Sequence, residues 1–142
     1  MQSKPCFHRS LVGIGALVLA GCAPSDPVKA PHAGLVDLLP VSDYPQIAVA
    51  SSLSEWLVFA PPTVLAASED GPMHVSVPLR STYDKQGLSI QYRFRFLDAY
   101  GRPTGHAGFR FAHLAPRMQD FVEANAMDGR AEDWRLEIRP AR

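Results

Sequence analysis

The stretch LSIQYRFRFL, residues 88–97, alternates apolar and polar side chains with a period of two. One side of the extended chain carries Leu88, Ile90, Tyr92, Phe94 and Phe96, and the other carries Ser89, Gln91, Arg93 and Arg95. This alternation is typical of a strand with one buried face and one solvent face. The stretch therefore predicts an all-β domain in which Phe94 and Phe96 face the core while Arg93 and Arg95 face water.

Shorter segments on both sides of this stretch show the same kind of pattern. Residues 73–79 alternate as well, although Pro78 cannot donate a hydrogen bond and should face a sheet edge or a bulge. The segment 120–126 fits either a strand or a helical turn, and a strand is favoured. Further apolar or alternating segments lie at 47–50, 57–59, 64–65 and 133–139. We expect an antiparallel β-sandwich of about six to eight short strands.

A turn signal, Asp98-Ala99-Tyr100-Gly101, follows the central strand directly. Aspartate at the first position and glycine at the fourth suit a type I turn with a left-handed residue at Gly101. The turn predicts a hairpin from the central strand into a second strand over residues 106–114.

The pattern of residues 1–21 indicates a signal peptide. Lys4 and Arg9 precede an uncharged apolar run of about ten residues, roughly half the length that crosses a bilayer. The run ends in Leu19-Ala20-Gly21-Cys22, which resembles the lipobox of bacterial lipoproteins. The resemblance implies that Cys22 is lipidated and becomes the first residue of the mature protein.

The residues that follow Cys22 indicate where the domain is held. Ala23, rather than aspartate, follows the cysteine, which in the lipoprotein sorting rule favours the outer membrane on its periplasmic side. Residues 22–45 are rich in proline and are expected to form a tether, and residues 46–142 to form the sandwich. We expect the protein to bind the membrane through its N-terminal lipid.

Composition excludes several classes of function. The chain has 14 basic and 14 acidic residues, so nothing supports nucleic-acid binding. With Cys6 in the signal peptide and Cys22 lipidated, no disulfide or cysteine-based metal site is expected. The histidines lack metal-site spacing, and no metal or cofactor is predicted.

The sequence favours a binding role over enzymatic activity. The chain lacks a G-x-S-x-G motif, and its adjacent carboxylates, Glu69-Asp70 and Glu132-Asp133, suit solvated turns. We therefore predict a non-enzymatic binding or adaptor module for an envelope protein or peptidoglycan. An envelope hydrolase acting on peptidoglycan or a related substrate is the alternative.

Arginines form the candidate binding surface. Arg93 and Arg95 alternate outward on one predicted strand, and Arg135 and Arg139 alternate outward on the last one, with Glu137 between them. If the two strands share a sheet, these four arginines form a possible surface for an anionic partner. The alternative is an ordinary solvated face of cross-strand ion pairs.

The lipobox, the segment VPLRSTYDKQGLSIQYRFRFLDAYGRP and the closing AEDWRLEIR resemble the YcfL-like family of small bacterial periplasmic lipoproteins. Tyr92, Phe94, Phe96, Asp98 and Gly101 match its strand-turn element. Its terminal strand is matched by Ala131, Trp134, Arg135, Leu136, Ile138 and Arg139. The resemblance implies an immunoglobulin-like sandwich and no known activity.

Overall fold

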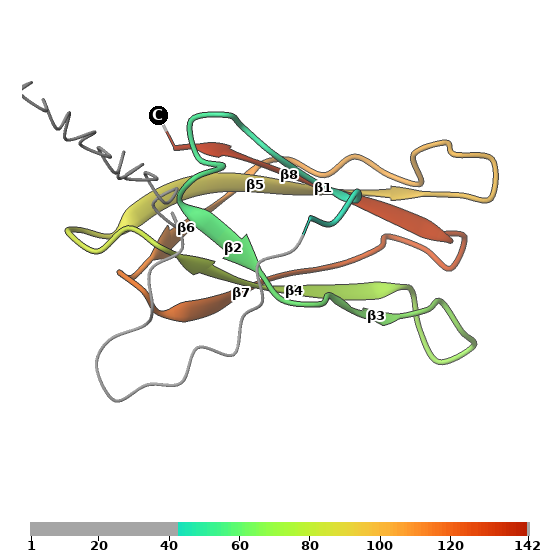
Figure 1. Ribbon diagram of the computed structural model, residues 1–142. Helices are drawn as coiled ribbons and strands as arrows, with labels where there is room; N and C mark the ends of the chain where they lie inside the picture. The colour runs from blue at the N-terminus through green and yellow to red at the C-terminus, as the bar shows by residue number, and fades with distance from the viewer. Residues whose placement is uncertain (1–42, 142) are drawn as a thin grey trace, which may run out of the picture.

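Eight strands fold into two stacked sheets in the computed structural model, which describes residues 43–141 (Figure 1). The strands are β1 Ile47–Val49, β2 Leu57–Phe59, β3 Thr63–Leu65, β4 His74–Ser81, β5 Leu88–Leu97, β6 Arg110–Leu114, β7 Gln119–Asn125 and β8 Asp133–Pro140. The predicted all-β sandwich is confirmed, and the ambiguous segment 120–126 belongs to strand β7. Over residues 43–141, no helix is long and apolar enough to cross a membrane.

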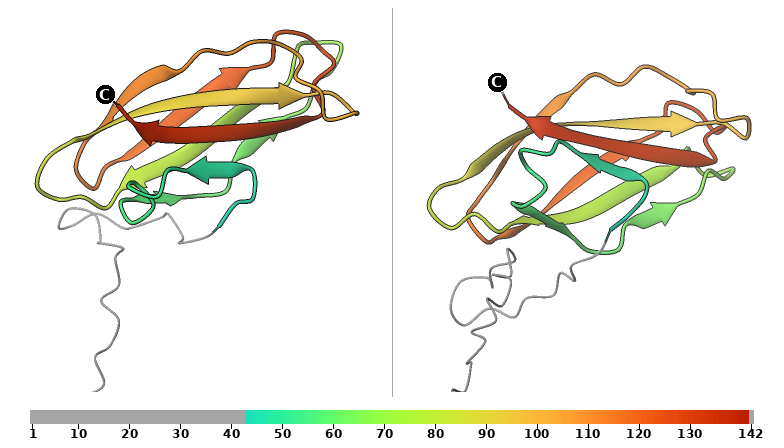
Figure 2. Two further views of the ribbon diagram at one scale, coloured as in Figure 1. Left: turned by 90° about the horizontal axis from the view of Figure 1, so that it is seen from above. Right: turned by 45° about the horizontal axis from the view of Figure 1, so that its top comes forward.

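The first sheet has the strand order β1-β8-β5-β6, and the second is built around β4. Strands β2 and β3 follow one another along one side of β4, and β7 pairs with its other side. All pairings are antiparallel except that of β1 with β8, which is parallel. Viewed from above, β5 and β8 lie side by side along the length of the sandwich (Figure 2).

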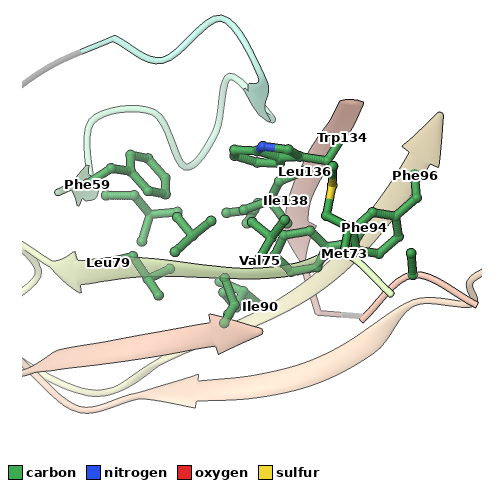
Figure 3. Packing of buried hydrophobic residues seen from close by; sticks show 14 of the residues in the cluster. Phe59, Met73, Val75, Leu79, Ile90, Phe94, Phe96, Trp134, Leu136 and Ile138 are labelled. Atoms are coloured by element: carbon green, nitrogen blue, oxygen red, sulfur yellow. The ribbon is translucent and has the colours of Figure 1, made fainter. Parts of the chain in front are cut away.

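Apolar side chains from both sheets meet between them and form the core (Figure 3). On β5 the side chains of Phe94 and Phe96 are only 2% and 7% exposed, as the alternation predicts. Strand β8 contributes Trp134, Leu136 and Ile138, all of them buried. Because β5 and β8 both alternate strictly, burying one face places every intervening side chain on the outer face of the sheet.

Pro78 lies at a break in the neighbouring strand. Its carbonyl accepts a hydrogen bond from the Ala60 amide at 3.1 Å, so its missing N–H faces the same side. On that side β2 has ended at Phe59 and β3 begins only at Thr63. The proline therefore stands where the ladder is interrupted, as its lack of a donor requires.

The turn after β5 forms as predicted, but the next strand begins later. Gly101 adopts a positive φ of 75°, and its amide donates to the Asp98 carbonyl at 2.9 Å. Residues 106–109, expected to open the second strand of the hairpin, lie outside β6, which starts at Arg110. Two glycines, Gly105 and Gly108, weaken strand formation in this segment. Thr104 to Gly108 line a pocket instead.

We predict that the carboxyl group of Asp98 titrates below the ordinary aspartate value. The Arg102 amide donates to it at 2.9 Å, and this bond, helped by the Arg102 guanidinium and the Tyr100 amide, holds the pKa of Asp98 below 3.8. The turn's contribution to stability should therefore be complete above the ordinary value and disappear as the pH falls through the lower, folded-state value.

Carboxyl-carbon NMR of the folded chain measures this pKa directly. In Arg102→Ala the pKa should return only part of the way, because the backbone amide at position 102 remains as a donor. A folded-state pKa at or above 3.8 would contradict the assignment.

Candidate functional site

The pairing of β5 with β8 brings the four predicted arginines onto one face. Across the two strands, Gln91 lies opposite Arg139, Arg93 opposite Glu137, and Arg95 opposite Arg135. These six side chains alternate with the buried residues of the same strands, so they project from the outer face of the first sheet. We call Arg93, Arg95, Arg135 and Arg139 the arginine face.

Two members of the arginine face are neutralised by carboxylates. Arg93 forms an ion pair with Glu137 directly across the strands. Arg135 pairs with Asp133, with the nitrogen and oxygen 2.7 Å apart. The sequence pattern indicated Glu137 as a partner and missed Asp133. It lies two residues before Arg135, so the strand alternation places both on the same face.

Arg139 is held by neutral groups. Its Nε and Nη2 donate to Gln91 Oε1 at 3.2 and 3.0 Å, and its guanidinium carbon lies 3.6 Å from the centre of the Phe109 ring. The guanidinium carbon of Arg93 lies 4.4 Å from the same ring. Phe109 therefore stacks with two cations, and the interaction orders the outer face without cancelling its charge. The role of Phe109 depends on the loop before β6, which local sequence patterns did not reveal.

Arg95 has no ion pair or hydrogen bond with any residue of the described range. Its side chain is exposed and lies directly opposite Arg135. The outward side chains of β5 and β8 include four arginines and only two carboxylates, Glu137 and Asp133. The face therefore keeps a positive excess, centred on Arg95 and smaller than four free arginines would give.

A pocket of about 230 Å³ opens between the two sheets, and Arg93 of the arginine face is among its lining residues. Its floor is formed by the inward aromatic side chains of β5, and its opposite wall by residues of β7 and by Met127. Thr104, His106 and Arg110 line it from the segment that joins β5 to β6. No aspartate or glutamate lines it, so the carboxylate pairs Glu69-Asp70 and Glu132-Asp133 lie elsewhere.

The remaining predictions concern the N-terminal residues, metal binding and Trp134. Cys22, the signal peptide and residues 22–42 of the tether lie outside the described residues, and their assignments stay predictions. Among residues 43–141, no cluster of histidine, cysteine, aspartate or glutamate is arranged to hold a metal ion. Trp134, which matches the terminal strand of the family, is buried in the core.

Comparison with known proteins identifies a family and supports the fold. No curated protein matches the chain. The crystal structure of Campylobacter jejuni cj0090 aligns with a TM-score of 0.58 and 22% identity, covering 68% of this chain and 98% of that one. A DUF1425 family member from Shewanella sp. pv-4 aligns with a TM-score of 0.53 and 19% identity, covering 61% and 79%. Because the model of DUF1425, described as a protein of unknown function, matches residues 46–140, the chain belongs to that family.

Proposed function

We propose that the protein is a lipid-anchored binding module of the bacterial envelope and that the arginine face contacts an anionic partner. The anchor would be Cys22, held in the outer membrane on its periplasmic side. The sandwich would then work as a rigid platform, because β5 and β8 pair along eight residues and fix the spacing of the arginines. The lipobox and the resemblance to YcfL-like lipoproteins support this location.

The observation that carries the proposal is the like-charge pair of Arg95 and Arg135. Like charges directly opposite each other in a sheet destabilise it by a few tenths of a kcal/mol. Asp133 offsets the charge of Arg135, and no described residue offsets that of Arg95. A carboxylate supplied by a partner would relieve this repulsion and would form a charge-assisted hydrogen bond with a guanidinium group.

Peptidoglycan is the partner we favour, and an acidic envelope protein is the alternative. Peptidoglycan combines peptide carboxylates with sugar rings. Beside the charges, the same outer face presents Phe111, which is 70% exposed and lies opposite Gln91 in the sheet. Exposed aromatic rings give flat apolar contacts beside a polar group, which suits a ligand of mixed character.

Cosedimentation of the full chain with purified peptidoglycan tests the proposal. Binding should be clear at about 0.01 M salt and weaken at about 0.15 M, because screening shortens from about 30 Å to about 8 Å. Arg95→Glu should reduce binding about three- to tenfold, since it removes an attraction and adds a repulsion. The same substitution should leave the thermal midpoint unchanged or raise it slightly, because it converts a like-charge pair into an opposite-charge pair.

The matched control is Lys85→Glu, which changes the net charge equally at an exposed position in the loop between β4 and β5. Equal losses for the two variants would show that the arginine face plays no particular part. A photo-crosslinker at Ala48, which is exposed and level with Glu137, would report an acidic protein partner in cells. Absence of both peptidoglycan binding and a crosslinked partner would refute the proposal.

A further inference from the structure

The pocket between the sheets offers a second site, which shares one lining residue, Arg93, with the arginine face. Its floor is a row of aromatic rings along the inner side of β5. Phe94 stacks on Phe96 with centroids 6.1 Å apart, and Tyr92 meets Phe94 edge-on at 6.2 Å. A floor of this kind favours an apolar body, and a flat ring above all.

Thr104 places an unsatisfied polar atom in this apolar setting. The residue is 8% exposed, and its Oγ1 has no hydrogen-bond partner among the described residues. Its amide donates to the Phe96 carbonyl at 3.0 Å, so the backbone holds the hydroxyl at the end of β5. A buried hydroxyl without a partner is costly. Oγ1 itself has almost no accessible surface, so a ligand acceptor would satisfy it only after a small shift of the pocket wall.

The remaining polar side chains of the wall favour a negative group on the ligand. Arg110 carries a permanent charge, and its one hydrogen bond within the described residues runs from Nη1 to the Glu123 carbonyl at 3.3 Å. That bond leaves most of its donors available. His106 also lines the pocket, and no carboxylate does. A carboxylate could accept hydrogen bonds from both the arginine and the threonine hydroxyl.

The mouth of the pocket can adapt its shape. Met127 lines it and is 76% exposed, and a Cβ at Gly105 would lie 2.5 Å from the Met127 sulfur. The absence of a side chain at Gly105 therefore lets the flexible thioether lie against the loop. Methionine adjusts readily to ligands of different outline.

We propose that this pocket binds a small amphipathic carboxylate, with an apolar ring on the floor of Tyr92, Phe94 and Phe96. The acid group lies toward Thr104 and Arg110. The volume of about 230 Å³ is below the usual range for drug-sized ligands, so the ligand is one ring with a short chain. The site does not depend on the binding function proposed for the arginine face.

Calorimetric titration with 4-phenylbutyrate tests this site, using the full chain in phospholipid nanodiscs and empty nanodiscs as the blank. The neutral 4-phenylbutyramide should bind about tenfold more weakly because it lacks the charge. Butyrate, which lacks the ring, should show no measurable binding. Thr104→Val keeps the shape and removes the hydroxyl, so it should weaken 4-phenylbutyrate about three- to tenfold without loss of folding.

Ala124→Leu should weaken 4-phenylbutyrate at least about tenfold, because it adds a side chain to the wall of the pocket. The matched control is Ala48→Leu, on the outer face of the other sheet, which should leave binding unchanged. If Ala124→Leu fails to fold, the affinity of Thr104→Val for 4-phenylbutyrate tests the proposal by itself. Binding that neither variant weakens, equal binding of acid and amide, or no heat at millimolar ligand would overturn the proposal. Peptidoglycan cosedimentation should survive both variants, which separates this site from the arginine face.

Discussion

Phe94→Ala should lower the free energy of unfolding by about 3–5 kcal/mol, the cost typical of removing a buried phenylalanine. Phe94 is 2% exposed and lies at the centre of an aromatic cluster. Its ring centroid is 6.1 Å from those of both Phe96 and Trp134. The truncation therefore removes contacts within β5 and across to β8, the most extensive pairing of the first sheet.

The pocket beside Phe94 affects how much stability the Phe94→Ala substitution removes. Phe94 lines that pocket, so the space left by the ring would join a cavity that is already open to solvent. An opening of this kind can fill with water or collapse, which favours the lower end of the range. Even about 3 kcal/mol is a large share of the 5–15 kcal/mol that stabilises a typical domain.

Denaturant unfolding of Phe94→Ala and Arg95→Ala, at neighbouring positions on one strand, measures the effect and its control. Arg95 is exposed and without a described partner, so its replacement should change stability by less than about 0.5 kcal/mol. The reverse order of midpoints would mean that the register of β5 is shifted by one residue, which exchanges its two faces.

The strands could be predicted from the sequence because each one carries its own burial pattern. Alternation in residues 88–97 and 133–139 fixes which side chains face the core, and Asp98 with Gly101 fixes the turn. These signals are local, so they need no knowledge of the neighbouring strand. They also place Arg93, Arg95, Arg135 and Arg139 at outward positions of their own strands. That the two strands share a sheet was a condition of the prediction, and the pairing of β5 with β8 meets it.

What the sequence could not supply are relations between distant segments. The parallel pairing of β1 with β8 and the shared use of β4 by β2 and β3 depend on packing, because short apolar runs fit many partners. The contacts of Phe109 with Arg93 and Arg139 are long-range for the same reason. Thr104 looks like an ordinary loop residue in the sequence, and only its burial in the folded chain draws attention to it.

Cys22→Ala should abolish lipid attachment and leave the precursor uncut. Only a thiol can carry the thioether-linked lipid, and in the lipobox scheme cleavage follows lipidation. Two or three acyl chains bind a membrane firmly because each buried CH₂ contributes about 0.8 kcal/mol, whereas a single chain binds only marginally. Incorporation of an alkyne-tagged fatty acid, followed by fractionation of inner and outer membranes, measures both lipidation and location.

The chain supplies its own control, since Cys6→Ala removes the other of its two cysteines. That variant should be lipidated, cut and sorted normally, because Cys6 lies inside the predicted signal peptide. Ala23→Asp should still acquire lipid but remain in the inner membrane, since aspartate after the lipidated cysteine is the retention signal. If fatty-acid labelling is lost in Cys22→Ala and in no other variant, the lipid is attached to the sulfur of Cys22. The sandwich would then be joined to the membrane through the predicted tether of residues 22–45. A Cys22→Ala chain that is still cut and fractionates with the outer membrane would remove the anchor assignment. Something other than a lipid on Cys22 would then have to hold the arginine face near its partner.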